Sequence, residues 1–134
     1  MINVGIVGTS AKVNTLVDTL NELAGVNPVG CYVGGDVKLD DQHKSLLFSS
    51  PNELIRSSDA VVVSSPHYSF DIAQSVLRSA KHLFLDVPFE VNVEQAGKLK
   101  NLAHEANVQF QIGLSERLNP AFIAARAIFK NQCL

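Results

Sequence analysis

Several residue types are scarce in this chain, and each scarcity excludes a class of protein. The 134 residues include two cysteines, one methionine and no tryptophan. Cys31 and Cys133 match neither a disulfide framework nor the ligand spacing of a metal site. We therefore expect no resident metal ion. Cys31 falls in an apolar segment, where a small buried thiol is the ordinary interpretation.

The chain also lacks a strong charge of either sign and a long apolar run. Its formal net charge is −2, which gives no basic surface for nucleic acid or acidic lipid. No apolar run approaches the roughly 20 residues that cross a bilayer. Residues 1–4 lack the charged segment and cleavage site of a secretory signal. We expect a cytoplasmic domain with neither nucleic acid nor a membrane among its partners.

What remains is a globular composition, with 46% apolar and 18% charged residues, arranged as alternating strands and helices. Strands are predicted at 2–7, 28–33, 60–63, 83–85 and 108–112, with a further short strand at 46–48. Helices are predicted at 13–24, 70–80 and 93–106, with others starting at 51 and 120, and the polar segment 36–44 is predicted to be a surface loop. This order predicts an α/β fold: a doubly wound, mainly parallel sheet of Rossmann type with helices on both faces.

Ligands of such folds bind beyond the carboxyl ends of the strands. The first of these loops has one of the three glycines of a dinucleotide fingerprint, Gly8. Ser10 and Val13 stand at the other two glycine positions. A helix N-terminus still attracts anions there, and Thr9, Ser10 and Lys12 could assist. An altered phosphate site and a plain strand-to-helix turn are equally good interpretations of this loop.

The second loop should supply an acid for the ribose hydroxyls, near the end of the second strand. Val33 occupies the expected position, and Asp36 follows after two glycines. Asp36 could reach back to a ribose, although an aspartate in such a place is more often a turn residue.

Five blocks of the sequence together match one family in order and spacing. They are residues 4–8 (VGIVG), 58–66 (SDAVVVSSP), 72–88, 112–114 (IGL) and 117–122 (RLNPAF). In these blocks the chain resembles the N-terminal domain of the glucose–fructose oxidoreductase / inositol dehydrogenase (Gfo/Idh/MocA) family. The resemblance implies a site for NAD or NADP. The candidate cofactor-binding residues are Gly8, Thr9, Ser10, Lys12, Asp36, Ser65, Pro66, His67, Asp86 and Pro88.

The chain departs from the family at the residues that carry the chemistry. The family has Glu-Lys-Pro after its fifth strand, with the lysine near the reacting carbons, and this chain has Asp86-Val87-Pro88. Valine neither donates a hydrogen bond nor carries charge. Ser69 stands where the family has a histidine; His67, two residues earlier, is a substitute or a solvated loop residue.

The resemblance also implies a second, C-terminal domain that supplies the substrate pocket, and no residues of this chain match it. Residues 1–118 are predicted to form the Rossmann-type domain and 119–134 the start of the next one. The candidates for proton transfer, His67, Asp86 and Glu90, have no substrate wall opposite them. We therefore assign no catalytic residue.

The last helix has an unusual composition. Asn119-Pro120 is a strong helix start, and every residue from 121 to 129 is apolar except Arg126. A helix that is apolar nearly all round needs cover on more than one side. We expect it to pack on its own domain with one face and on a second copy of the chain with the other. A deep groove of its own domain and a frayed tail are the alternatives.

Three functions are consistent with these observations. The first is an NAD(P)-binding domain that descends from an oxidoreductase and is not catalytic alone. The second is an oxidoreductase completed by a second domain or partner chain. The third is an interaction module that keeps the fold without a ligand. The fold alone does not decide among them, and the altered glycine loop with Val87 favours the first over the second.

Overall fold

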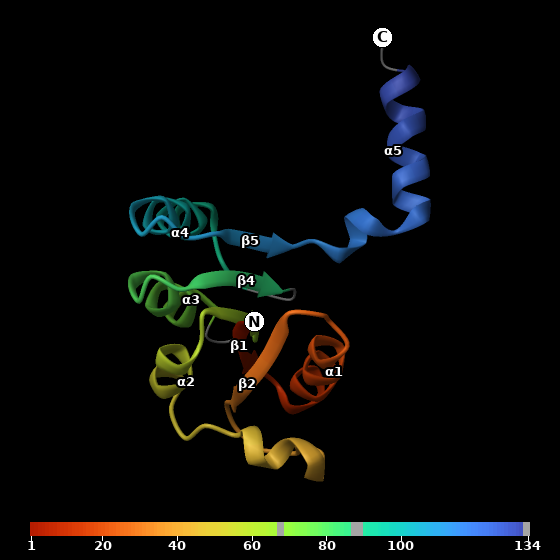
Figure 1. The fold of residues 1–134 in the computed structure, drawn as a ribbon. Helices are drawn as coiled ribbons and strands as arrows, with labels where there is room; N and C mark the ends of the chain where they lie inside the picture. Colours follow the sequence, from red (N-terminus) through yellow and green to blue (C-terminus); the bar gives the residue numbers. More distant parts are fainter. Residues whose placement is uncertain (67–68, 87–89, 133–134) are drawn as a thin grey trace.

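The protein is described by a computed structural model covering residues 1–66, 69–86 and 90–132. It contains one parallel sheet in the order β2-β1-β3-β4-β5 (Figure 1). The strands are β1 Ile2–Gly8, β2 Val26–Val33, β3 Ala60–Ser64, β4 His82–Asp86 and β5 Phe110–Gly113. The α-helices are α1 Ser10–Asn21, α2 Pro51–Ser57, α3 Ser69–Arg78, α4 Val93–Glu105 and α5 Pro120–Gln132. The short 3₁₀ helices are η1 Asp41–Leu46 and η2 Ser115–Leu118.

Helices cover both faces of the sheet, as the sequence predicts. On one face α1 packs over β1 and β2, where Val13 and Val17 bury against Ile6 and Cys31. On the other face α2, α3 and α4 form the larger core, a cluster that includes Leu54, Val61, Val63, Val76, Leu77, Leu85 and Leu99. Each such buried side chain contributes about 1.5–3 kcal/mol by leaving water. The pairing register places Ile6, Val62, Phe84 and Gln111 in one row, so β4 and β5 continue the face on which α1 lies.

The prediction of a short strand at 46–48 is wrong. The chain forms η1 there and then makes a single parallel bridge between Leu47 and Cys31. The Phe48 N–H donates to the Cys31 carbonyl at 2.8 Å. Ser50 already caps the next helix, which leaves too few residues for a ladder. Leu47 nevertheless lies on the side of β2 away from β1, the place of the third strand in a Rossmann sheet.

The segment 36–44 is also not the plain surface loop that its polarity predicts. Leu39 is buried in the core beneath α1, and His43 is buried as well, with 4% of its surface exposed. Polar composition misled the prediction because His43 reaches hydrogen-bonding partners on α1 that are distant in the sequence. The segment therefore folds against α1 and then reaches the edge of β2.

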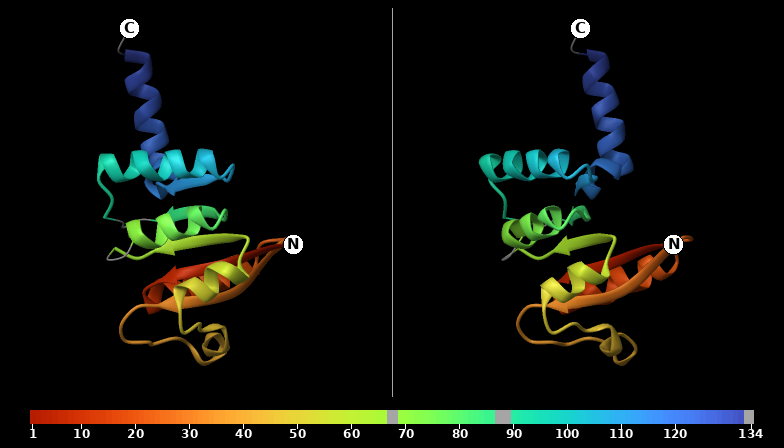
Figure 2. Two further views of the ribbon diagram at one scale, coloured as in Figure 1. Left: turned by 90° about the vertical axis from the view of Figure 1, so that its left-hand side faces the viewer. Right: turned by 60° about the vertical axis from the view of Figure 1, so that its left-hand side comes forward.

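The prediction that α5 packs on its own domain is wrong. All residues of the helix from 120 to 129 are exposed, including Phe122, Ile123, Ile128 and Phe129. The helix projects away from the sheet in each view (Figures 1 and 2). After β5, the 3₁₀ turn η2 redirects the chain, and Asn119 then caps α5 through the Ala121 N–H. Packing on a second copy stays a prediction.

Within the described ranges, no helix is both long and apolar enough to cross a membrane. The same residues contain no group of three or more histidine, cysteine, aspartate or glutamate side chains that could hold a metal ion.

Candidate functional site

The candidate site lies at the carboxyl edge of the sheet, between β1 and β3. At this point the strand order reverses, because β2 lies on one side of β1 and the later strands lie on the other. The helix that follows β1 packs on one face and the helix that follows β3 packs on the other. In doubly wound folds such a reversal leaves a crevice outside the ends of the two strands, and nucleotides bind there. The strand ends that border it are Gly8 on β1, Ser64 on β3 and, one strand further, Asp86 on β4.

Gly8 has a structural reason to be glycine. A Cβ at this position would lie 3.0 Å from the Ser64 carbonyl oxygen and 3.5 Å from Cγ2 of Val13. Val13, which replaces the third glycine of the fingerprint, is fully buried between α1 and the sheet. The helix thus tolerates valine at its packing position while β1 keeps a glycine at its end. Retention of Gly8 follows from packing and does not by itself indicate a ligand.

The N-terminus of α1 is open toward the crevice. Thr9 is the N-cap residue of α1, but its side chain makes no hydrogen bond to the helix. Ser50, Asn92 and Asn119 do cap their helices with side-chain oxygens. The first backbone N–H groups of a helix have no partner inside the helix. Those of α1 therefore have no side-chain cap from Thr9, and the altered phosphate site in this loop stays a prediction.

Ser10 replaces the second glycine of the fingerprint, and its side chain faces the loop after β2. Its hydroxyl donates to the Asp36 carbonyl at 3.2 Å and accepts from the Lys38 N–H at 2.9 Å. The turn that leads from β2 to Asp36 needs a glycine at position 35, because the φ of Gly35 is 87° and lies in the left-handed region. Ser10 therefore fixes the backbone of Asp36 beside the start of α1, while the Asp36 side chain is exposed. Val33, at the position where an acid was expected, is buried in the core.

Lys12, Ser64 and Asp86 meet at the end of the crevice. The Lys12 ammonium lies 3.3 Å from Oδ2 of Asp86, and the Ser64 hydroxyl donates to the same oxygen at 2.9 Å. The side chain of Lys12 is 47% exposed and that of Asp86 is 16% exposed. Ser64 is buried. The Asp86 carboxylate thus accepts a hydrogen bond from the end of β3, and its charge is balanced by a more exposed lysine from α1.

Sequence reasoning chose Lys12 and Asp86 separately and missed Ser64. Strand β3 ends in consecutive serines after an apolar run, and this polar end was a signal for Ser64. Of the other predicted residues, Ser65 is buried and Pro66 is partly buried beside it. Glu90 is exposed. His67, Val87 and Pro88 lie outside the described residues.

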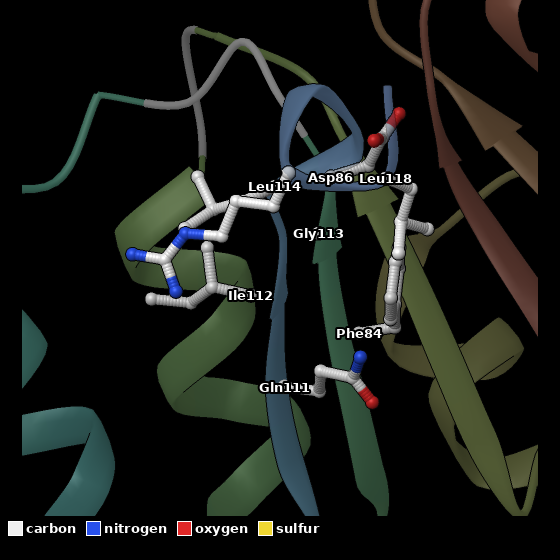
Figure 3. Close-up of a pocket in the computed structure, with 8 residues that line it drawn as sticks. Phe84, Asp86, Gln111, Ile112, Gly113, Leu114 and Leu118 are labelled. Carbon is white, nitrogen blue, oxygen red and sulfur yellow. The ribbon is translucent and has the colours of Figure 1, made fainter. Parts of the chain in front are cut away.

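A groove begins at Asp86 and continues over the sheet face that α1 leaves uncovered. It has a volume of about 370 Å³. Figure 3 shows Phe84 and Gln111 on the neighbouring strands β4 and β5, with Asp86 at the carboxyl end. A Cβ at Gly113 would overlap the Phe84 ring, so this glycine leaves room for the ring beside β5. Side chains alternate between the two faces along β4. Leu83 and Leu85 point into the larger core, so Phe84 between them was the sequence signal for a side chain on the groove face.

A second polar cluster, absent from the sequence predictions, lies on the flank of α1. Nδ1 of His43 is 3.0 Å from Oδ1 of Asn14, and Nε2 is 3.0 Å from Oδ1 of Asp18. Oδ1 of Asn14 also accepts from the Asp40 N–H at 3.2 Å. These bonds fasten η1 and the preceding loop to α1. Their place, away from the strand ends, indicates a structural role.

The parallel sheet and its helices define the protein as a domain of the Rossmann fold, and comparison with known proteins identifies its family. The model of the oxidoreductase family with an NAD-binding Rossmann fold, GFO_IDH_MocA, matches residues 2–114. The chain belongs to the Gfo/Idh/MocA oxidoreductase family and carries its NAD-binding domain. The family resemblance and the fold class predicted from the sequence are therefore confirmed.

Two curated relatives cover most of this chain. Glucose-6-phosphate 3-dehydrogenase of Bacillus subtilis is 24% identical over 121 residues, which are 87% of this chain and 35% of the relative. UDP-N-acetylglucosamine 3-dehydrogenase of Acidithiobacillus ferrooxidans is 26% identical over 103 residues, 76% of this chain and 32% of the relative. The chain thus spans about a third of the length of these relatives.

Among solved structures, biliverdin reductase of Synechocystis sp. PCC 6803, in complex with biliverdin and NADP+, has the same fold. Its TM-score is 0.79 at 20% identity, over 94% of this chain and 42% of that one.

Proposed function

We propose that this chain binds a nicotinamide dinucleotide, NAD or NADP, across the crevice between β1 and β3 and is not catalytic alone. The observation that carries the proposal is the position of the predicted residues. Gly8, Ser10 and Lys12 gather at the edge of the sheet where an NAD-binding Rossmann domain holds its cofactor, and Asp86 meets them there.

The described residues fit such a cofactor. The open N-terminus of α1 and the half-exposed ammonium of Lys12 suit a diphosphate. Asp36, held beside the start of α1 by Ser10, suits the hydroxyls of the adenosine ribose. A carboxylate there repels the 2′-phosphate of NADP, so Asp36 favours NAD when it faces the ribose. When bound, the nicotinamide accepts or donates a hydride.

The absence of catalysis by the chain alone is supported by its own residues. Val87 replaces the lysine that the family resemblance implies near the reacting carbons. The Asp86 carboxylate is engaged by Lys12 and Ser64, and Glu90 is exposed. General acid–base catalysis needs a proton-transfer group placed at the reacting atom.

Calorimetric titration with NADH and NADPH tests the proposal. A matched pair of variants locates the site: Ala11→Asp and Asn52→Asp each add a carboxylate at the second position of a helix, α1 and α2 respectively. A negative charge at a helix N-terminus favours the helix, so neither change should unfold the protein. Ala11→Asp should weaken binding about tenfold by repelling the phosphates. Asn52→Asp should leave it unchanged. Absence of heat with both cofactors would refute the proposal.

A second candidate function is a dehydrogenase that a further domain or partner chain completes. It is favoured by the groove beside Asp86, which opens on a sheet face that no described helix covers at β4 and β5. The curated relatives, three times as long as the matched region, are dehydrogenases of sugar phosphates or nucleotide sugars. Hydride transfer that appears only when a second component is added would establish this function. The remaining alternative, an interaction module without ligand, predicts no cofactor binding.

A further inference from the structure

The ion pair between Lys12 and Asp86 crosses the crevice. Lys12 lies in the first turn of α1, directly after β1, whereas Asp86 ends β4. Strand β3 lies between these two strands in the sheet. Neighbouring strands are about 4.8 Å apart, so β1 and β4 are separated by nearly twice that distance. The Lys12 side chain must therefore extend past the end of β3 to reach the carboxylate.

The position of Lys12 is unfavourable for the helix itself. A positive charge in the first turn opposes the helix dipole, and the first turn of α1 contains no acidic residue. The described partner of this ammonium is Asp86. Of the two side chains, the carboxylate is fixed by Ser64 and mostly buried, whereas the lysine is the exposed and long one. Lys12 is therefore the member of the pair that can change partner.

We infer that this ion pair is a latch across the crevice: the diphosphate of the dinucleotide takes Lys12 from Asp86 when it binds. The inference rests on the proposed function and adds its regulation. A diphosphate carries more negative charge than one carboxylate and presents several acceptor oxygens to an ammonium. Asp86 is then a competitor of the ligand for Lys12, so that removing its charge strengthens binding.

Two single substitutions test the latch with effects of opposite sign. Asp86→Asn keeps an oxygen that accepts from the Ser64 hydroxyl but loses the charge. It should tighten the binding of ADP, which carries the diphosphate without the nicotinamide half, by about two- to fivefold, as for an ion pair that is half exposed on the lysine side. Lys12→Met should weaken ADP binding about tenfold. In a protein that already carries Lys12→Met, adding Asp86→Asn should not increase the affinity for ADP, because the lysine for which Asp86 competes is absent.

A matched control comes from the ion pair between Lys44 and Asp41 on η1. The two charged groups are 2.6 Å apart, and both side chains are exposed. Asp41→Asn and Lys44→Met make the same changes in net charge beyond the outer edge of β2. Calorimetry in buffer without divalent cations should show small effects for both.

The outcomes separate the latch from the proposed function. Binding of NADH with equal ADP affinity in the Asp86→Asn and Asp41→Asn variants would overturn the latch and leave the function standing. Weaker ADP binding by Asp86→Asn would also overturn it. If neither the natural protein nor Asp86→Asn binds NADH, NADPH or ADP, both proposals fall.

Discussion

At the scale of the residue, Ser10 shows how an altered glycine motif can still build a cofactor edge. Its hydroxyl accepts from Lys38 and donates to Asp36, so the side chain is directed to the loop after β2. A glycine at this position could not hold that loop. With serine in place of glycine, the backbone of this turn is less open to a close approach by a phosphate, but the loop after β2 is fixed. Lys12 adds a positive charge at the same edge.

A prediction at this scale concerns Cys31. Burial raises the pKa of its thiol above the ordinary value of 9.0. The folded protein then keeps the proton at a pH where the unfolded chain loses it. The resulting stability is complete below pH 9.0 and is lost as the pH rises through the higher pKa of the folded state.

Chemical denaturation of the natural protein and of a Cys31→Ala variant, measured at several values from pH 7 upward, checks this expectation. The variant has no thiol at position 31, so the free-energy difference between the two proteins should shrink above pH 9.0. A difference that stays constant with pH would contradict a buried, protonated thiol. Contributions of lysines and tyrosines are common to both proteins and cancel.

Several residues of the site could be predicted from the sequence, but their contacts could not. Gly8, Lys12 and Asp86 were identified from their positions after apolar strands, a local signal. Lys12 and Asp86 are 74 residues apart, and their pairing depends on the strand order. The sequence suggested Ser10 as an aid to phosphate binding, but it does not show which way a hydroxyl turns, and in the structure this one bonds to the backbone of Asp36 and Lys38.

At the scale of the element, the segment from 36 to 48 depends on one buried side chain. His43 joins η1 to α1 through Asn14 and Asp18. We predict that His43→Ala lowers the free energy of unfolding by about 1–3 kcal/mol, since the buried imidazole and its hydrogen bonds to Asn14 and Asp18 are lost. Amide hydrogen exchange should become faster in η1. His104, exposed on α4, supplies the control: His104→Ala should change neither quantity. Unaltered exchange in η1 of the His43 variant would contradict the anchoring role.

The elements that sequence patterns predicted best have local signals. The strands β1, β3 and β4 are apolar runs, and α4 begins with a capping box formed by Asn92 and Gln95. The segment 46–48 was misassigned because its β-type composition serves a single bridge at Leu47. Gly30, which has no Cβ, leaves the space beside β2 that the Phe48 ring fills. Such a long-range fit has no local signature.

At the scale of the whole molecule, α5 is the helix that the described residues leave exposed from 120 to 129. Phe122, Ile123, Ile128 and Phe129 are between 47% and 69% exposed. A helix that exposes apolar residues on several sides favours association. We expect two copies of this chain to associate through α5 at micromolar concentration, which light scattering would detect as twice the chain mass.

Substitutions on α5 test this expectation. Ile123→Ser together with Phe129→Ser should give a single-copy mass. Val93→Ser, which removes an apolar side chain that is 91% exposed on α4, should leave the mass as it was. A natural protein that scatters as one copy would contradict the expectation.

The central claim is that the edge formed by β1, β3 and β4 binds a nicotinamide dinucleotide, and NMR tests it most directly. Titration of the ¹⁵N-labelled protein with NADH and with NADPH reports each backbone amide. The account predicts that signals of Gly8, Ser10 and Lys12 shift first, with those of Ser64 and Asp86, while signals of α5 stay in place. A spectrum that neither cofactor changes, or shifts confined to α5, would contradict it.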